Sequence, residues 1–243
     1  DDPGTLLQVV RVFGYLPLDD TLEDRRQRME EGLWYLSRIQ QLPQPEYRKI
    51  EDQDWMAAWK KHYRPIAIGE RLMVLPAWIE PQDPERIPIH IDPSMAFGTG
   101  THPTTQLCLA MIEKHVRPGE PVIDVGCGSG ILSIAALKLG ASHALGVDID
   151  RESVKATRDN SQFNRVFAGM EIGQGSVAEV LDGNFSMKEA PVVLVNILAP
   201  IILRLFAAGL AKLVAKGGTL ILSGILNDQE ERIRAAAQAD GLT

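Results

Sequence analysis

The feature that most constrains the fold of this chain is the regular alternation of apolar strands and helices from residue 121 onward. Short runs of apolar residues (121–126, 143–149, 192–197 and 220–225) are each followed by a helical pattern (131–140, 151–163, 200–214 and 228–240). Continuous apolar strands separated by helices are typical of βαβ units, in which a parallel sheet is covered on both faces. The sequence therefore predicts an α/β fold with a doubly wound, Rossmann-like sheet.

A smaller α+β unit is predicted ahead of this sheet. Residues 9–17 have the apolar, β-branched and aromatic character of a strand, and residues 19–39 repeat apolar side chains at helical spacing. Thr21 and Asp24 are placed to form a capping box at the start of this helix. The sequence therefore predicts one strand and one amphipathic helix in the front part of the chain.

Two prolines, Pro43 and Pro45, end the front helix and mark the boundary of a domain. The next stretch carries Trp55 and Trp59 four residues apart, so both lie on one helix face, where packing is the usual role. We therefore expect a small domain over residues 1–45, a linker helix over 46–64 and the main domain over 65–243. Strands over 72–80 and 87–91 are expected to lead into the main domain.

Composition excludes several classes of protein. The net charge of -7 argues against non-specific binding of nucleic acid, which needs clustered Lys and Arg side chains. The only cysteines, Cys108 and Cys127, indicate buried thiols in a reducing compartment rather than a disulfide scaffold. No apolar run is long enough to span a bilayer, no signal peptide is evident, and the five histidines lack metal-ligand spacing. We expect a cytoplasmic protein with no membrane partner and no metal site.

A glycine-rich loop follows the first strand of the predicted sheet. Ligands bind at the carboxyl ends of such strands, and the glycines Gly126, Gly128 and Gly130 let a nucleotide approach the backbone. A dinucleotide fingerprint would need a glycine at position 131, where the chain has Ile131. This spacing favours S-adenosylmethionine over NAD, although the loop by itself is also compatible with a purely structural tight turn.

Polar side chains end two other strands of the sheet. Asp148 comes about twenty residues after the loop, where its carboxylate can accept hydrogen bonds from two ribose hydroxyls. Asp150 is placed as the N-cap of the next helix. Asn196 is the first polar residue after a buried strand and offers an acceptor and two donors to a ligand; the alternative is a simple turn-forming role. Pro200 suits the first turn of the following helix.

The string DPSMAFGTGTHPTT, residues 92–105, precedes a helix over 104–116. Its glycines let the backbone fold closely over a ligand, and Thr101 is placed to cap a helix that begins near His102. The positive end of that helix suits the carboxylate of the cofactor's methionine half. His102 is placed either to touch a ligand or to cap the helix. Spacing alone leaves Thr101, Thr104 and Thr105 open as the direct contact.

Four strings of the chain together resemble one known family. AFGTGTHPTT, VIDVGCGSGILSIAALKLGA, GVDID and VNILA, in this order and at these separations, closely resemble the bacterial ribosomal protein L-eleven methyltransferase family. The first string is the most specific, because the glycine-rich loop is shared by very many S-adenosylmethionine enzymes. The resemblance runs from about Gln53 to the last helix.

The resemblance implies an S-adenosylmethionine-dependent class I methyltransferase that modifies lysine side chains and the N-terminal amine of a large-subunit ribosomal protein. It implies cofactor contacts at Thr105, Gly126, Asp148 and Asn196, and it assigns substrate recognition to the front domain. The front domain looks shorter than the family's, and a final antiparallel pair of strands is expected to be missing after residue 243.

In such an enzyme the cofactor supplies the reactive methyl group, and the protein is expected to position it and the acceptor amine. Methyl transfer is an in-line displacement that needs a neutral amine, so an apolar mouth that lowers the pKa of the lysine is expected. Phe97, Ile197 and Leu198 are candidate walls of that mouth, and Asn196 is the candidate catalytic residue that holds the amine in line with the methyl group.

We expect a monomer, and three alternatives remain for the function. One is a close relative that acts on another protein or on a small amine. Another is an NAD-dependent oxidoreductase, which Ile131 and the absence of a Tyr and Lys proton-donor pair disfavour. The third is a cofactor-binding protein without activity.

Overall fold

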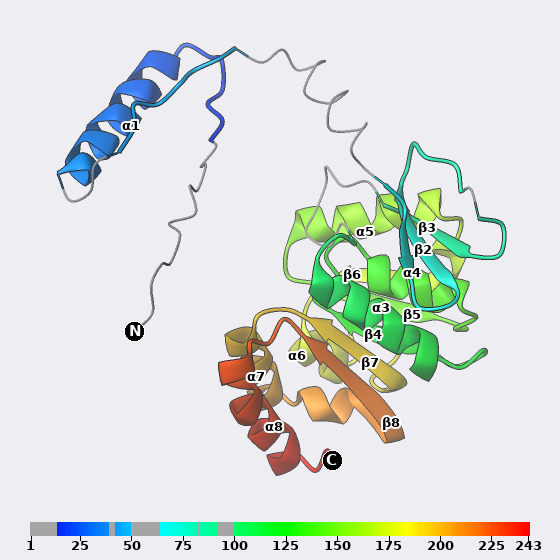
Figure 1. Cartoon of the computed structure of the whole chain (residues 1–243). Coiled ribbons are helices and arrows are strands. Elements are labelled where there is room, and N and C mark those ends of the chain that lie inside the picture. The colour runs from blue at the N-terminus through cyan, green and yellow to red at the C-terminus, as the bar shows by residue number, and fades with distance from the viewer. Residues whose placement is uncertain (1–13, 39–41, 50–63, 82, 92–99) are drawn as a thin grey trace, which may run out of the picture. The chain divides into compact units, whose positions relative to one another are not determined.

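The computed structural model describes residues 14–38, 42–49, 64–81, 83–91 and 100–243 (Figure 1). The chain divides into two compact units, Asp1–Lys61 and His62–Thr243. The predicted linker helix over 46–64 falls mostly outside the described ranges, as do Trp55 and Trp59. Residues 42–49 are described and contain no helix or strand. The domain division at 45 and 64 therefore stays a prediction.

The front unit contains the helix α1, Leu22–Ser37, which confirms the helix predicted over 19–39. Its predicted capping box is wrong, because the Thr21 hydroxyl donates to Asp19 Oδ1 at 2.6 Å instead of accepting from the helix. The Thr21 N–H donates to the same carboxylate oxygen at 3.0 Å, so Asp19 organises the turn before the helix. Residues 14–17 of the predicted strand 9–17 have no regular structure, and the rest of that strand lies outside the described residues.

The main unit is built on a five-stranded sheet with the order β6-β5-β4-β7-β8, in which every neighbouring pair is parallel. Its strands, in chain order, are β4 (Val122–Val125), β5 (Ala144–Asp148), β6 (Met170–Gln174), β7 (Ala190–Asn196) and β8 (Val214–Ser223). From β4 the chain first winds outward through β5 and β6 and then returns to the other side of β4 as β7. This order confirms the doubly wound, Rossmann-like sheet and puts its switch point between β4 and β7.

Helices cover both faces of the sheet, and each layer has its own core (Figure 1). One face carries α3 (Pro103–His115), α4 (Ile131–Lys138) and α5 (Arg151–Phe163), and the other carries α6 (Val177–Asp182), α7 (Ala199–Ala207) and α8 (Glu230–Ala239). Alternation along β4 divides the cores, since Val122 belongs to the first cluster and Ile123 to the second. The central strands β4, β5 and β7 are therefore buried on both faces, as their continuous apolar character predicts.

Two parts of the sheet differ from the sequence-based expectation. The strand β6 and the helix α6 were not predicted, because the strand MEIGQ has no continuous apolar run and only Met170 is buried. The helix predicted over 200–214 ends at Ala207, since Gly209 adopts a left-handed conformation with φ +98°. A short 3₁₀ turn follows, and β8 then extends through the turn that was predicted at 217–219.

A separate three-stranded sheet in the same unit precedes α3. It consists of β1 (Ile66–Ile68), β2 (Leu72–Pro76) and β3 (Ile87–Ile91), with β1 antiparallel and β3 parallel to β2. The strand β3 confirms the prediction over 87–91, β2 confirms the first part of the strand predicted over 72–80 and ends at Pro76, and β1 was not predicted. Partly buried and buried side chains of all three strands join the core of α3 and α4, so this sheet lies against that helical layer.

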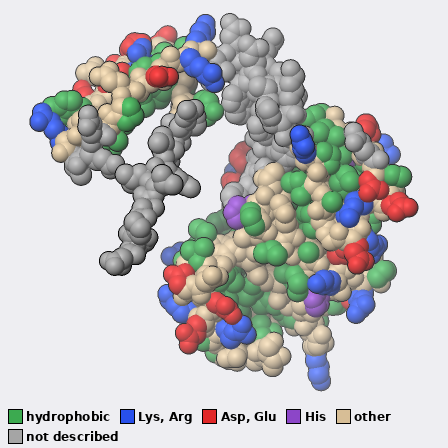
Figure 2. Space-filling model, viewed as in Figure 1, with side chains coloured by type: hydrophobic (Ala, Val, Ile, Leu, Met, Phe, Trp, Pro, Cys, Tyr) green, Lys and Arg blue, Asp and Glu red, His purple; other side chains and the backbone are tan. Residues whose placement is uncertain are grey.

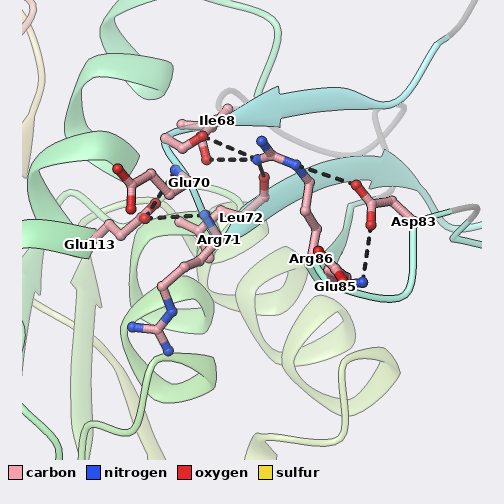
Figure 3. A network of polar contacts seen from close by, with 9 residues as sticks. Ile68, Glu70, Arg71, Leu72, Asp83, Glu85, Arg86 and Glu113 are labelled. Carbon is pink, nitrogen blue, oxygen red and sulfur yellow. Dashed lines mark hydrogen bonds and ion pairs between the residues drawn. The ribbon is translucent and has the colours of Figure 1, made fainter.

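A polar network ties the turn between β1 and β2 to α3 (Figure 3). Glu113 of α3 accepts hydrogen bonds from the N–H groups of Glu70 and Arg71 at 3.0 and 3.1 Å. From the other side, the Arg86 guanidinium donates to the Leu72 and Gly69 carbonyl oxygens at 2.9 and 3.2 Å. Gly69 has φ +55°, and a Cβ there would overlap the Glu113 carboxylate. The network therefore fixes the small sheet against α3.

The surface shows no concentration of one charge on the face in Figure 2, where basic and acidic side chains are interspersed. Within the described ranges, no helix has both the length and the apolar character to cross a membrane. Those residues also contain no group of three or more His, Cys, Asp and Glu side chains that could hold a metal ion. Cys108 and Cys127 are both buried and unpaired, as predicted.

Candidate functional site

The glycine-rich loop lies at the carboxyl edge of the sheet, where β4 turns into α4. The N–H groups of Gly126 and Cys127 both donate to the Val147 carbonyl, at 2.8 and 3.1 Å, so the loop folds over the end of β5. Gly126 and Gly128 have φ +75° and +54°, values that disfavour any other residue. A Cβ on Gly126 would lie 2.9 Å from Ile197 Cγ2. At Gly126 and Gly128 the loop thus carries no side chain, at the position where the sequence predicts a nucleotide.

Asp148 is the last residue of β5, and its carboxylate is held in place by two backbone groups. Oδ2 accepts from the Gly128 N–H and Oδ1 accepts from the Asp150 N–H, both at 3.0 Å. The residue is only half-buried, and each carboxylate oxygen can accept more than one hydrogen bond. The carboxylate is therefore oriented by the loop and retains acceptor capacity for ligand hydroxyls.

The N-cap predicted at Asp150 is confirmed. Its carboxylate accepts from the N–H groups of Glu152 and Ser153 at 3.3 and 3.2 Å, at the start of α5. The helix begins at Arg151, as predicted. Asp148 and Asp150 thus lie two residues apart with separate roles: one carboxylate contacts the glycine-rich loop and the other caps a helix.

The cap of α3 is His102, and the cap predicted at Thr101 is wrong. His102 has extended backbone angles, φ -72° and ψ 136°, and its Nδ1 accepts from the Thr104 N–H at 3.3 Å. This conformation suits the residue immediately before Pro103, because proline disfavours helical angles in the residue that precedes it. Of the string 92–105, residues 92–99 lie outside the described ranges, and so does Phe97.

Two predicted site residues, Thr105 and Asn196, contact each other. Thr105 on α3 is fully buried, and Asn196 ends β7; the Asn196 Nδ2 donates to the Thr105 Oγ1 at 3.4 Å. On the neighbouring strand, the Ser223 hydroxyl donates to the Thr104 carbonyl at 3.4 Å. These contacts fasten the first turn of α3 to the carboxyl ends of β7 and β8.

The residues that follow Asn196 form the edge of the site. Ile197 is half-buried, whereas Leu198 is 70% exposed. Pro200 lies in the first turn of α7, as predicted. A Cβ on Gly224 would overlap the backbone of Ile197, so the segments after β7 and β8 pass each other in close contact.

Asp124 is a buried acid beneath the glycine-rich loop. Its Oδ2 accepts from the Ser133 N–H and hydroxyl of α4 at 3.2 and 2.7 Å, and its Oδ1 is buried without a hydrogen-bond partner. Burial raises the pKa of Asp124 from 3.8 to about 6, while the hydrogen bonds from Ser133 oppose the rise. This carboxylate is aimed at the helix that leaves the loop.

Sequence reasoning missed two contacts to the loop from α5. The Thr157 hydroxyl donates to the Gly128 carbonyl at 2.8 Å, and the Asn160 amide donates to the Ser129 carbonyl at 2.9 Å. The available signal was a pair of polar residues three apart on a helix whose inward face should be apolar. The site therefore combines the carboxyl ends of β4, β5, β7 and β8, the glycine-rich loop and the helices α3, α4 and α5.

Comparison with known proteins gives a consistent result over most of the chain. Residues 3–243 match the family profile described as ribosomal protein L11 methyltransferase (PrmA). A protein of that name from Hahella chejuensis is 42% identical over 229 residues, which cover 94% of this chain and 73% of the relative. Another from Chloroflexus aurantiacus is 38% identical over 249 residues, covering 94% of this chain and 75% of the relative.

A solved structure supports the same assignment. The crystal structure of the ribosomal protein L11 methylase from Lactobacillus delbrueckii subsp. bulgaricus has a TM-score of 0.63 and 34% sequence identity to this chain. The match covers 73% of this chain and 89% of that structure. The fold, the matched profile and these relatives agree: the chain is a methyltransferase and belongs to the ribosomal protein L11 methyltransferase family.

Proposed function

We propose that this chain is an S-adenosylmethionine-dependent protein N-methyltransferase that modifies lysine side chains and the N-terminal amine of ribosomal protein L11. The observation that carries the proposal is the convergence of the glycine-rich loop, Asp148 and Asn196 at the switch point of the sheet. The names of the relatives support the choice of acceptor.

The residues around the loop suit a nucleoside cofactor. Gly126 and Gly128 let the cofactor approach the backbone, and a side chain at Gly126 would also collide with Ile197. Asp148 would accept hydrogen bonds from the two ribose hydroxyls, with its carboxylate already oriented by the Gly128 N–H. The first turn of α3, with Thr105, would face the methionine half. When bound, S-adenosylmethionine supplies an electrophilic methyl group on a sulfonium.

Asn196 would position the attacking amine. Its Nδ2 donates to Thr105, so its Oδ1 is directed away from that contact and can accept from a neutral amine. A free lysine has a pKa of ~10.4. Contact of its amine with the apolar side chains of Ile197 and Leu198 would lower that pKa by desolvation. The chain itself needs no nucleophile, because the acceptor amine attacks the methyl group directly.

The front domain, over residues 1–45, would bind the protein substrate. In support, α1 exposes Trp34 and Tyr35, which are 53% and 68% accessible. Aromatic side chains of this kind are enriched at protein interfaces. The proposal includes a monomeric enzyme in the cytoplasm, where its ribosomal substrate is made.

The acceptor is tested by incubating the full chain with isotopically labelled S-adenosylmethionine and ribosomal protein L11, followed by mass spectrometry of the modified sites. Label on lysines and on the N-terminal amine is expected. Asn196→Ala should slow transfer by about 100-fold or more, because the amine loses its positioning partner. Transfer only to a different protein or to a small amine would keep the chemistry and overturn the acceptor. Full turnover by Asn196→Ala would overturn its catalytic role.

The cofactor site is tested by calorimetry on Asp148→Ala. Two hydrogen bonds to a charged acceptor are lost, at about 1.5 kcal/mol or more each, so S-adenosylmethionine should bind about 100-fold more weakly. The matched control is Asp150→Ala, which removes a carboxylate two residues away that only caps α5. That variant should lose stability while keeping its affinity. Equal affinity losses in the two variants would place the ribose elsewhere.

A further inference from the structure

The inward face of α5 is polar, which is unusual for a helix packed on a sheet. Thr157 and Ser161 are 0% exposed, and Asn160 and Asn164 are 5% exposed. Their spacing places all four side chains on one face of the helix and its C-cap. Buried polar groups cost free energy unless they are hydrogen-bonded, so their partners indicate what the face is for.

At one end of this face the partners are carbonyl groups of the glycine-rich loop. Thr157 binds the Gly128 carbonyl and Asn160 binds the Ser129 carbonyl. In a trans peptide the C=O and N–H groups point in opposite directions. Holding the Gly128 carbonyl toward α5 therefore directs the Ser129 N–H away from α5, so these two side chains set the orientation of the loop backbone.

At the other end the partner is the edge strand β3. The Asn164 Oδ1 accepts from the His90 N–H at 2.9 Å, and its Nδ2 donates to the His90 carbonyl at 2.6 Å. Among the strands of the described residues β3 is the last of the small sheet, so within that part of the chain these groups have no strand neighbour on that side. The amide of Asn164 takes the place of such a neighbour and satisfies both groups.

The two asparagines are also joined to each other, since the Asn164 Nδ2 donates to the backbone carbonyl of Asn160 at 2.9 Å. We propose that Asn160 and Asn164 are positioning residues that form a continuous hydrogen-bonded link from β3 to the glycine-rich loop and thereby set the loop for cofactor binding. The inference rests on the cofactor site proposed above. Neither residue is assigned a contact with the cofactor, and Asn164 acts only through Asn160 and the backbone.

The test uses the full chain and the variants Asn164→Ala and Asn160→Ala, with Ser161→Ala as the matched control. Ser161 is equally buried on the same face, but its hydroxyl donates only within its own helix, to the Arg158 carbonyl at 2.7 Å. Asn164→Ala should weaken S-adenosylmethionine binding by about 3- to 30-fold, a typical range for residues that modulate a site without touching it. Ser161→Ala should leave the affinity within about twofold.

A double-mutant cycle distinguishes coupling between Asn160 and Asn164 from independent effects of the two substitutions on cofactor affinity. If Asn164 acts through Asn160, the double variant should bind the cofactor no more weakly than Asn160→Ala alone. Additive losses, an unchanged affinity in Asn164→Ala, or an equal loss in Ser161→Ala would each overturn the link. If Asn164→Ala does not fold, Asn164→Ser replaces it, because serine adds no charge and is too short to bind both backbone groups of His90 and the Asn160 backbone carbonyl together.

Hydrogen exchange tests the same link without any cofactor. The Gly130 N–H donates to the Cys127 carbonyl within the loop at 2.8 Å, so its protection reports the loop conformation. Asn164→Ala should speed its exchange by about fivefold or more, and exchange equal to that of the wild type would overturn the inference. Failure of the wild-type chain to bind S-adenosylmethionine would instead overturn the proposed function and leave this measurement to decide on the link.

Discussion

The helices α4 and α5 both border the glycine-rich loop, yet they are held in opposite ways. In α4, six of eight residues are buried: Ile131, Leu132, Ser133, Ile134, Ala135 and Ala136. Five of these six are apolar. In α5 the buried residues are Ala156, Thr157, Asn160 and Ser161, and three of these four are polar.

The difference separates stability from geometry. Apolar burial is non-directional and contributes free energy in proportion to area, so α4 anchors the loop without choosing its orientation. Hydrogen bonds are directional and contribute less net stability, so the contacts from α5 select one orientation of the loop carbonyls. We therefore expect changes in α4 to act on the free energy of unfolding and changes in α5 to act on cofactor affinity.

The largest effect that tests this comparison is expected from Ile134→Ala in α4. Ile134 is 0% exposed in the first core cluster, and its truncation should lower the free energy of unfolding by about 2 to 5 kcal/mol. Cofactor affinity, measured at a temperature where the variant is folded, should stay within about twofold of the wild type. Urea denaturation and calorimetry give the two values.

The counterpart in α5 is Asn160→Ala, which should show the reverse pattern, with a smaller loss of stability and a larger loss of affinity. If Ile134→Ala weakened cofactor binding as much as Asn160→Ala, the division of roles between the helices would be wrong.

Much of the main unit was predictable because its central strands, β4, β5 and β7, are buried on both faces. Continuous apolar runs and the helices between them identified four of the five strands, and the start of α5 followed from its cap at Asp150. The strand β6 was not predicted because it lies at the edge of the sheet, is mostly half-buried, and mixes polar and apolar residues. Edge strands are partly solvated, so hydrophobic patterning identifies them poorly.

The residues at the strand ends of the site were predictable, whereas the contacts between distant elements were not. The strand-end rule placed the glycine-rich loop, Asp148 and Asn196 at one edge, because the carboxyl ends of parallel strands meet there. The link through Asn164 could not be predicted, since its partner His90 lies 74 residues earlier and belongs to a different sheet. Contacts of this kind depend on how two sheets pack around a helix, which no local pattern records.

An intermediate effect is expected from the hydrogen bonds that Ser133 of α4 donates to Asp124. The pKa of Asp124 is raised from 3.8 to about 6, mainly by burial. The folded chain thus binds this proton more tightly than the unfolded chain, and the stability that follows is fully present below pH 3.8 and is lost as the pH rises through about 6. Relative to Asp124→Asn, the wild-type free energy of unfolding should therefore fall by about 2 kcal/mol between pH ~4 and ~7.

The measurement is urea denaturation of both proteins at each pH, since the difference between them cancels the other titrating groups. A difference that is flat across this range would mean that Asp124 keeps an ordinary pKa. In that case the hydrogen bonds from Ser133 would offset the cost of burying the carboxylate, and α4 would depend on a directional contact as α5 does.

The smallest effect concerns the C-terminal ends of the same two helices, which share one hydrogen-bond pattern. In α4 the Gly140 N–H donates to the Leu137 carbonyl and the Ala141 N–H to the Ala136 carbonyl, both at 3.0 Å. In α5 the Arg165 and Val166 N–H groups make the equivalent bonds, at 2.9 and 3.0 Å. Both helices therefore end in a Schellman motif.

The residue in the left-handed position differs between the two motifs. Gly140 adopts φ +106° without a Cβ, whereas Arg165 adopts φ +60° with one, and it is the only non-glycine residue with positive φ in the described chain. Burial lowers the pKa of nearby Lys138, and the charge of Arg165 lowers it further.

Arg165→Gly should raise the free energy of unfolding by about 0.5 to 1 kcal/mol, because relief of the backbone strain at residue 165 exceeds the added entropy of the unfolded chain. Arg165→Ala is the control, since it removes the charge and keeps the Cβ. If both variants stabilised the chain equally in urea denaturation, the charge rather than the backbone would be the cause, and the ends of α4 and α5 would be equivalent in strain.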